Sequence, residues 1–144
     1  MKATIERSST GDPEQMYRVV RDYHRRAAAL TENFRNYQVV EGGEGGGTVV
    51  SYTFDAGRTH RDYRLHVEED AALRTLREHD ESTTFVATWS VRPQGGASRV
   101  SVTCEWDGAG GVAGIFERVL APIGLRRIYG QVLANLDRLG NDPS

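Results

Sequence analysis

The side chains best suited to chemistry in this sequence stand at positions 61, 63, 78 and 79. Arg61 and Tyr63 are two residues apart, so in a strand they share one face. An arginine and a phenol at that spacing can hold a carbonyl or enolate oxygen by donating hydrogen bonds. Glu78 and His79 can take up or release a proton. These four residues are candidate catalytic groups for polarising a carbonyl and removing an α-proton.

Both pairs also have a structural interpretation. An unpaired buried cation is unfavourable, so Arg61 is expected at the mouth of a cavity, beside a carboxylate or at a sheet edge. A rim position near the start of its strand satisfies this requirement. Glu78 and His79 are near a turn, and the pattern around them does not resolve their faces, because Leu73 and Leu76 fall on opposite sides. We therefore expect Glu78 and His79 at the surface.

The histidines and the cysteine do not form a metal-binding pattern. The four histidines are His24, His60, His66 and His79, and none has the spacing of a helical metal motif. His60 and His66 are about 20 Å apart along an extended strand, too far for one ion. The single cysteine, Cys104, excludes an internal disulfide and has the apolar neighbours of an inert core thiol. The sequence predicts no metal and no cofactor.

The glycine-rich segment 42–47 can be compared with phosphate-binding loops. A P-loop needs Gly-Lys-Ser/Thr at the start of a helix. Here Gly47-Thr48 leads into a strand and no lysine is near. The segment is therefore predicted to be a structural turn.

Length and charge limit the classes of protein that remain. The chain has 144 residues and a formal net charge of −2, which predicts one domain over 1–140, with a flexible tail at 141–144. A nearly neutral chain is poorly suited to nucleic acid or an anionic membrane surface. No apolar segment reaches the length of a membrane span, about 20 residues. We expect a cytoplasmic protein, either a monomer or a homodimer.

The elements that must position these residues follow from hydrophobic periodicity. A weak strand over 3–8 precedes a helix that Asp12 caps, with Gln15 completing a capping box. A second helix, or an extension of the first, is predicted to reach about Arg35. Short connections favour antiparallel pairing of the next segments. These are 37–41, 48–55, 59–68, 71–79, 82–93 and 98–106, before a terminal helix over 112–139 with a kink at Pro122.

Strand alternation assigns aromatic residues to the inward face. Four of them carry a polar atom on an apolar ring: Tyr52, Tyr63, Trp89 and Trp106. They either line a ligand cavity or form a packed core, and the pattern does not separate these two interpretations. For Phe54 and Phe85 core packing is the simpler interpretation.

The order of these elements resembles the START-like, or SRPBCC, superfamily, in its polyketide cyclase/dehydrase-type branch. The resemblance covers about residues 3–139. It rests on Asp12-Pro13-Glu14, the segment 39–48 with its glycines, the strand ending at Arg92-Pro93, the Gly95-Gly96 turn and the helix containing Pro122. It implies an α+β helix-grip fold: a curved antiparallel sheet of about six to seven strands around a long C-terminal helix, with two short helices after the first strand.

The resemblance also implies a cavity for apolar or amphipathic molecules between sheet and helix. The implied ligand contacts are Tyr52, Phe54, Arg61, Tyr63, Phe85, Trp89, Cys104, Trp106, Val119 and Ile123. The preferred function is binding of a lipid, polyketide or aromatic metabolite. One alternative is a polyketide cyclase, aromatase or dehydratase, and another is a protein-interaction module. The volume of the cavity, and any buried ionisable pair facing it, would separate these functions best.

Overall fold

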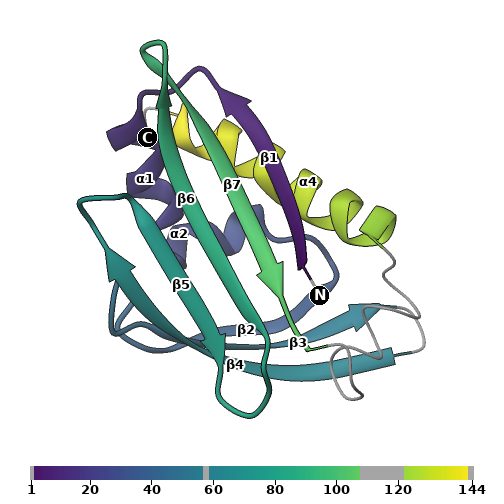
Figure 1. Cartoon of the computed structure of the whole chain (residues 1–144). Helices are drawn as coiled ribbons and strands as arrows, with labels where there is room; N and C mark the ends of the chain where they lie inside the picture. The colour runs from purple at the N-terminus through teal and green to yellow at the C-terminus, as the bar shows by residue number, and fades with distance from the viewer. Residues whose placement is uncertain (1, 57–58, 108–121, 143–144) are drawn as a thin grey trace.

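Seven antiparallel strands form the framework of the computed structural model, which describes residues 2–56, 59–107 and 122–142. The strands are β1 (Lys2–Ser9), β2 (Phe34–Glu41), β3 (Val49–Ala56), β4 (Thr59–Asp70), β5 (Thr75–Asp80), β6 (Val86–Gln94) and β7 (Ala97–Glu105). They lie in the order β1-β7-β6-β5-β4-β3-β2, so β1 and β2 are the edges. The expected curved antiparallel sheet is confirmed (Figure 1).

Helices cover one side of this sheet. They are α1 (Pro13–Val20), α2 (Tyr23–Arg26), a 3₁₀ turn η1 (Ala27–Ala29) and α4 (Pro122–Gly140). The core lies between them and the inward rows of β3 to β7, where the predicted alternation is confirmed: the odd-numbered apolar positions of β6, for example, are buried. The predicted α+β helix-grip architecture is thus observed (Figure 1).

The described part of the terminal helix packs its apolar face against the core. Leu125, Tyr129, Val132, Leu133 and Leu136 are buried along α4. The predicted segment 112–121 and residues 143–144 of the tail lie outside the described residues. Pro122 is the first residue of α4, and the residues that would precede the predicted kink are outside the described ranges.

The prediction of a helix that reaches about Arg35 is wrong. Asp22 is extended and its backbone forms a bridge with Glu44, which ends α1 and lets the Asp22 side chain cap a new, short α2. After η1 the chain turns, because the Phe34 amide donates to the Thr31 carbonyl at 3.0 Å, and Phe34 begins β2. Leu30 and Phe34 of the predicted apolar stripe therefore pack on the core from a turn and a strand, whereas Ala27 is exposed.

The predicted cap of α1 is half correct. The Asp12 side chain accepts from the Gln15 amide at 2.8 Å. The Gln15 side chain does not complete a capping box. It donates instead to the Gly140 carbonyl at 2.6 Å, which connects the start of α1 to the end of α4.

The ambiguous segment 71–79 is resolved by its turn. Residues 71–74 form a tight turn in which Arg74 has a φ of 51° and Leu73 is 69% exposed. The strand β5 starts only at Thr75, so Leu76 and Glu78 point inward and His79 points outward. The expected surface position of Glu78 is wrong: this residue is 3% exposed.

A bulge interrupts the edge strand β2. Arg35 pairs with Thr53 and Gln38 with Ser51, so Asn36 and Tyr37 together face one residue, Tyr52. Asn36 has a φ of 55°, a left-handed conformation that asparagine tolerates. Because of the extra residue, Tyr37 points to the core, where it packs against the buried cluster.

The glycine-rich turn agrees with its structural interpretation. Four of its backbone amides donate to other parts of the protein: Gly43 to Thr48 Oγ1, Gly45 to the Arg21 carbonyl, Gly46 to Glu69 Oε1 and Gly47 to the Val67 carbonyl. These amides are therefore already used and cannot hold a phosphate.

Glu69 accepts the hydrogen bond from the Gly46 amide, and its carboxylate makes the stability of the fold depend on pH. It accepts hydrogen bonds from Arg21 Nε at 2.9 Å, from the Tyr17 hydroxyl and from the Gly46 amide. The Arg21 hydrogen bond, helped by those from Tyr17 and Gly46, lowers the pKa of Glu69 from 4.5 to about 2. Because the pKa is lower in the folded state, this stabilisation is present above pH 4.5 and is lost as pH falls through 2.

We expect Glu69→Gln to reduce the free energy of unfolding at pH 7 by about 1.5–3 kcal/mol, since hydrogen bonds to a charged group are lost. The difference from wild type should shrink between pH 5 and pH 2, as the wild-type carboxylate becomes protonated. Urea unfolding at pH 7, 4 and 3 measures this. Glu68→Gln, on the exposed face of β4, is the control and should change little. A difference that stays constant with pH would contradict the assignment.

Candidate functional site

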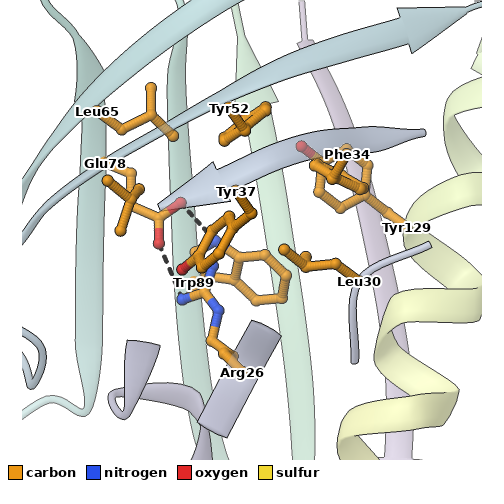
Figure 2. A pocket seen from close by; sticks show the side chains of 10 residues that line it. Arg26, Leu30, Phe34, Tyr37, Tyr52, Leu65, Glu78, Trp89 and Tyr129 are labelled. Carbon is orange, nitrogen blue, oxygen red and sulfur yellow. Dashed lines mark hydrogen bonds and ion pairs between the residues drawn. The ribbon is translucent and has the colours of Figure 1, made fainter. Parts of the chain in front are cut away.

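A small cavity lies between α2, the start of β2 and the inward face of the sheet (Figure 2). Its volume is about 20 Å³, enough for roughly one water molecule. The lining is mainly aromatic and aliphatic, and consists of Arg26, Leu30, Phe34, Tyr37, Val50, Tyr52, Leu65, Glu78, Trp89 and Tyr129. Side chains thus fill most of the space in which the family resemblance implied a ligand.

A buried ion pair forms the polar end of the cavity. Arg26 extends from α2 and Glu78 from β5, and Arg26 Nη1 is 2.9 Å from Glu78 Oε2 (Figure 2). The two side chains are 7% and 3% exposed. A buried ionisable pair that faces the cavity is a feature expected to separate the possible functions, and this pair is one.

Both oxygens of Glu78 accept hydrogen bonds. Besides Arg26, the Tyr23 hydroxyl donates to Oε2 at 2.6 Å and Trp89 Nε1 donates to Oε1 at 3.0 Å. Three donors fix this carboxylate in place, and a proton added to it would remove the counterion of the buried Arg26. The geometry of Glu78 therefore fits an orienting role better than that of a general base.

Aromatic rings hold the Arg26 guanidinium. Its Cζ lies 4.4 Å from the centre of the Tyr23 ring and 4.3 Å from that of Trp89, within the range of cation–π contacts. Nη1 also donates to the Val20 carbonyl at 3.1 Å. Burial favours a lower pKa for Arg26, but the charge and hydrogen bond of Glu78 together with Tyr23 and Tyr37 outweigh it and raise the pKa, so the side chain stays cationic. Arg26 Nε has no hydrogen-bond partner within the described parts of the chain.

The phenols around the cavity are neutral groups. Burial raises the pKa of Tyr37 to about 12, and its hydroxyl donates to the Tyr23 carbonyl at 3.1 Å. Burial also raises the pKa of Tyr52 and of Tyr129 well above the ordinary value. At neutral pH these hydroxyls can donate or accept hydrogen bonds, but they do not supply a phenolate nucleophile.

The structure brings only some of the predicted site residues to the cavity. Tyr52, Trp89 and Glu78 line it. Other predicted ligand contacts are buried in the same core without lining it: Phe54, Tyr63, Phe85, Cys104 and Trp106. Val119 and the side chain of Ile123 lie outside the described residues.

The remaining candidates lie apart from the ion pair. Arg61 is partly exposed, and its Nε is buried without a partner in the described ranges, as is the Tyr63 hydroxyl. Burial raises the pKa of Tyr63. His79 lies on the outer face, where its ring stacks on His66 with 5.7 Å between centroids and its Nε2 is 3.2 Å from Glu68 Oε1. Arg61 and Tyr63 therefore form a second polar group, and His79 does not face the cavity.

Cys104 agrees with its expected role in the core. It is a buried free cysteine, and burial raises the pKa of its thiol to about 12. Within residues 2–56, 59–107 and 122–142, no group of three or more His, Cys, Asp or Glu side chains is placed to hold a metal ion.

Seven lining residues were not among the predicted site residues: Arg26, Leu30, Phe34, Tyr37, Val50, Leu65 and Tyr129. Arg26 was detectable, because it follows Val19 by seven positions and Tyr23 by three, on the apolar side of the predicted helix. Arg61 was selected as a candidate because it is a charged residue on an apolar face, and the same criterion applies to Arg26. Tyr37 begins the predicted segment 37–41, for which no inward face was assigned, and the bulge that turns it toward the core starts just before that segment.

Comparison with known proteins fits this geometry. The family described as "Polyketide cyclase / dehydrase and lipid transport" matches residues 1–140. The chain belongs to this family. The predicted START-like, polyketide cyclase/dehydrase-type relationship is thereby confirmed. Among curated proteins nothing matches the chain.

Solved structures share the fold of this family member. The solution structure of the KanY protein is 35% identical, with a TM-score of 0.87 over 99% of this chain and 98% of that one. A ginseng major latex-like protein from Panax ginseng is 12% identical, with a TM-score of 0.74 over 99% and 98%. The ZhuI aromatase/cyclase from Streptomyces sp. R1128 is 16% identical, with a TM-score of 0.70 over 96% and 94%. The last two are alike in fold alone.

The fold of this family suits binding of hydrophobic ligands. None of the helices in the described ranges is both long and apolar enough to cross a membrane.

Proposed function

We propose that this family member binds one small hydrophobic or amphipathic molecule between its sheet and the helical layer, without chemical turnover. One observation carries the proposal: a cavity walled by aromatic rings encloses a single, internally neutralised ion pair. Aromatic walls favour a flat apolar ligand, and a small number of fixed polar groups orients it. A lipid, a polyketide and an aromatic metabolite are the ligand classes that this chemistry allows.

The volume of about 20 Å³ means that the cavity must expand to receive such a ligand. Leu30, Phe34 and Tyr37 are only partly buried, and they come from the short connection after η1 and from the edge strand β2. Rotation of these side chains would join the cavity to solvent. This segment is therefore the proposed entrance.

Two features support binding over the other classes. Glu78 is the counterion of the buried Arg26, so taking up a proton would leave that cation uncompensated, which disfavours acid–base catalysis there. The described residues expose only two large hydrophobic side chains, Val40 and Leu73, and an interaction module would be expected to show a larger apolar patch. We further propose that the protein is cytoplasmic, that it is a monomer or a homodimer, and that Cys104 stays reduced.

The Tyr63 hydroxyl and Arg61 Nε favour a second candidate function, a polyketide cyclase or dehydratase. They are buried donors without acceptors in the described parts of the chain, and such donors can polarise a carbonyl. If the protein turns over a poly-β-ketone, Arg61→Met and Tyr63→Phe should lower kcat at least tenfold. Unchanged turnover in both variants would remove this candidate.

Binding can be tested with the neutral probe N-phenyl-1-naphthylamine. In a Trp106→Phe variant, Trp89 is the only remaining tryptophan, and it lines the cavity. We expect binding with a stoichiometry near one and quenching of the Trp89 emission. Phe34→Ala should weaken binding about tenfold, equivalent to 1.4 kcal/mol, because Phe34 lines the cavity.

The matched control is Phe85→Ala, which removes the same side chain from the core away from the cavity. It should lower stability and leave affinity within twofold. If no probe binds, or if both variants weaken binding equally, the proposal of a cavity ligand fails.

A further inference from the structure

We propose that the Arg26–Glu78 pair selects ligands with an uncharged acceptor oxygen, such as a ketone, ester or ether, and rejects carboxylates. This inference rests on the proposed binding function and specifies its ligand class. It follows from the charge around the cavity, the unused donor beside it and the way in which the guanidinium is held.

The first argument is the balance of charge. Of the described side chains that line the cavity, only Arg26 and Glu78 are charged, and they are 2.9 Å apart. The site is thus neutral as a whole. A carboxylate that entered would be a third buried charge, attracted by Arg26 and repelled by Glu78, with its desolvation uncompensated. A free fatty acid or an aromatic acid is therefore a poor ligand.

The second argument is the unused donor. Glu78 and the Val20 carbonyl accept from Arg26 Nη1, while Nε is buried and has no acceptor within the described residues. A buried donor without a partner is unfavourable, so an acceptor that reaches it gains more than the same contact in water. A neutral oxygen can supply this hydrogen bond without adding a charge.

The third argument is orientation. The contacts of Tyr23 and Trp89 with Arg26, at 4.4 and 4.3 Å, place aromatic faces against the guanidinium. Glu78 holds the same arginine and is itself fixed by hydrogen bonds from both aromatic residues. The donor is thus fixed before the ligand arrives, and little ordering is needed on binding. A flat ligand whose oxygen lies at the edge of its ring system matches this arrangement.

Three ligands of similar size test the selection: 2-isopropylnaphthalene, 2-acetylnaphthalene and 2-naphthoate. Their affinities are measured at pH 7 by quenching of Trp89 in the Trp106→Phe variant. We expect the ketone to bind about tenfold more tightly than 2-isopropylnaphthalene, and the carboxylate to bind more weakly than both. Equal affinities, or tightest binding of the carboxylate, would overturn the inference while leaving the proposed function intact. If none of the three binds, the proposed function itself fails.

Glu78→Gln should reverse the selection. Without the carboxylate the cation is no longer neutralised, so 2-naphthoate should become the tightest of the three ligands. Glu68→Gln, on the exposed face of β4, should leave the order unchanged. If Glu78→Gln does not fold, the double variant Arg26→Met/Glu78→Leu replaces it. The double variant should still bind 2-isopropylnaphthalene and should lose the preference for the ketone. A preference retained in either variant contradicts the role of the pair.

Discussion

Replacement of Val132 by aspartate is expected to abolish the cooperative unfolding transition. Val132 lies on α4 with 0% of its surface exposed, in the core between helix and sheet. An unpaired carboxylate there loses its hydration and gains no partner, a loss of at least about 4–5 kcal/mol. That is comparable with the whole stability of a domain, about 5–15 kcal/mol. Circular dichroism during heating and urea titration measures the loss directly.

Two residues on the same helix serve as controls. Ile128, one turn earlier, is only half-buried, so Ile128→Asp should be clearly less damaging, although the sequence pattern treats the two positions alike. Gln131 is exposed, and Gln131→Asp should change the free energy of unfolding by less than about 0.5 kcal/mol. A Val132→Asp protein that melts within a degree or two of wild type would show that α4 packs through another face.

Removal of Glu78 has the second largest expected effect. Glu78→Ala leaves the Arg26 cation buried without its counterion, and it also leaves the Tyr23 hydroxyl and Trp89 Nε1 without their acceptor. Breaking a buried pair from one side costs about 3–5 kcal/mol. Urea unfolding at pH 7 should show a loss in this range.

The double variant Arg26→Met/Glu78→Leu separates charge from packing. It removes both charges and keeps similar volumes, so it should regain most of the stability lost in Glu78→Ala. Glu68→Ala, at an exposed salt bridge with Arg77, should cost less than about 1 kcal/mol. If the double variant is as unstable as Glu78→Ala, the loss comes from packing and not from an uncompensated charge.

The sheet could be predicted well because burial in a strand repeats every two residues. Tyr52, Tyr63 and Trp89 were assigned to the inward face by this alternation alone, and all three are buried. The break between α1 and α2 was harder to detect. It depends on the pairing of Asp22 with Glu44 in the glycine-rich turn, a contact between distant positions that helical periodicity does not encode.

The candidate site was less predictable, because it depends on contacts across the fold. Arg26 and Glu78 come from a helix and a strand that are far apart in the chain, so neither segment alone shows that the two residues meet. Which face of the sheet Glu78 lies on depends on how many residues the preceding turn contains. Leu73 looked like part of the strand, yet it lies in that turn, and only the position of Thr75 at the start of β5 fixes Glu78 inward.

The bulge in β2 also has a consequence for the behaviour of the protein at high concentration. An edge strand offers free amides and carbonyls that can pair with another chain and start aggregation. In β2 the register shifts twice, once around Asn36 and Tyr37 and once between Val39 and Glu41. Such irregularities break the even row of hydrogen-bonding groups that an incoming strand would need. The distortion that turns Tyr37 toward the cavity therefore also protects this edge of the sheet from self-association.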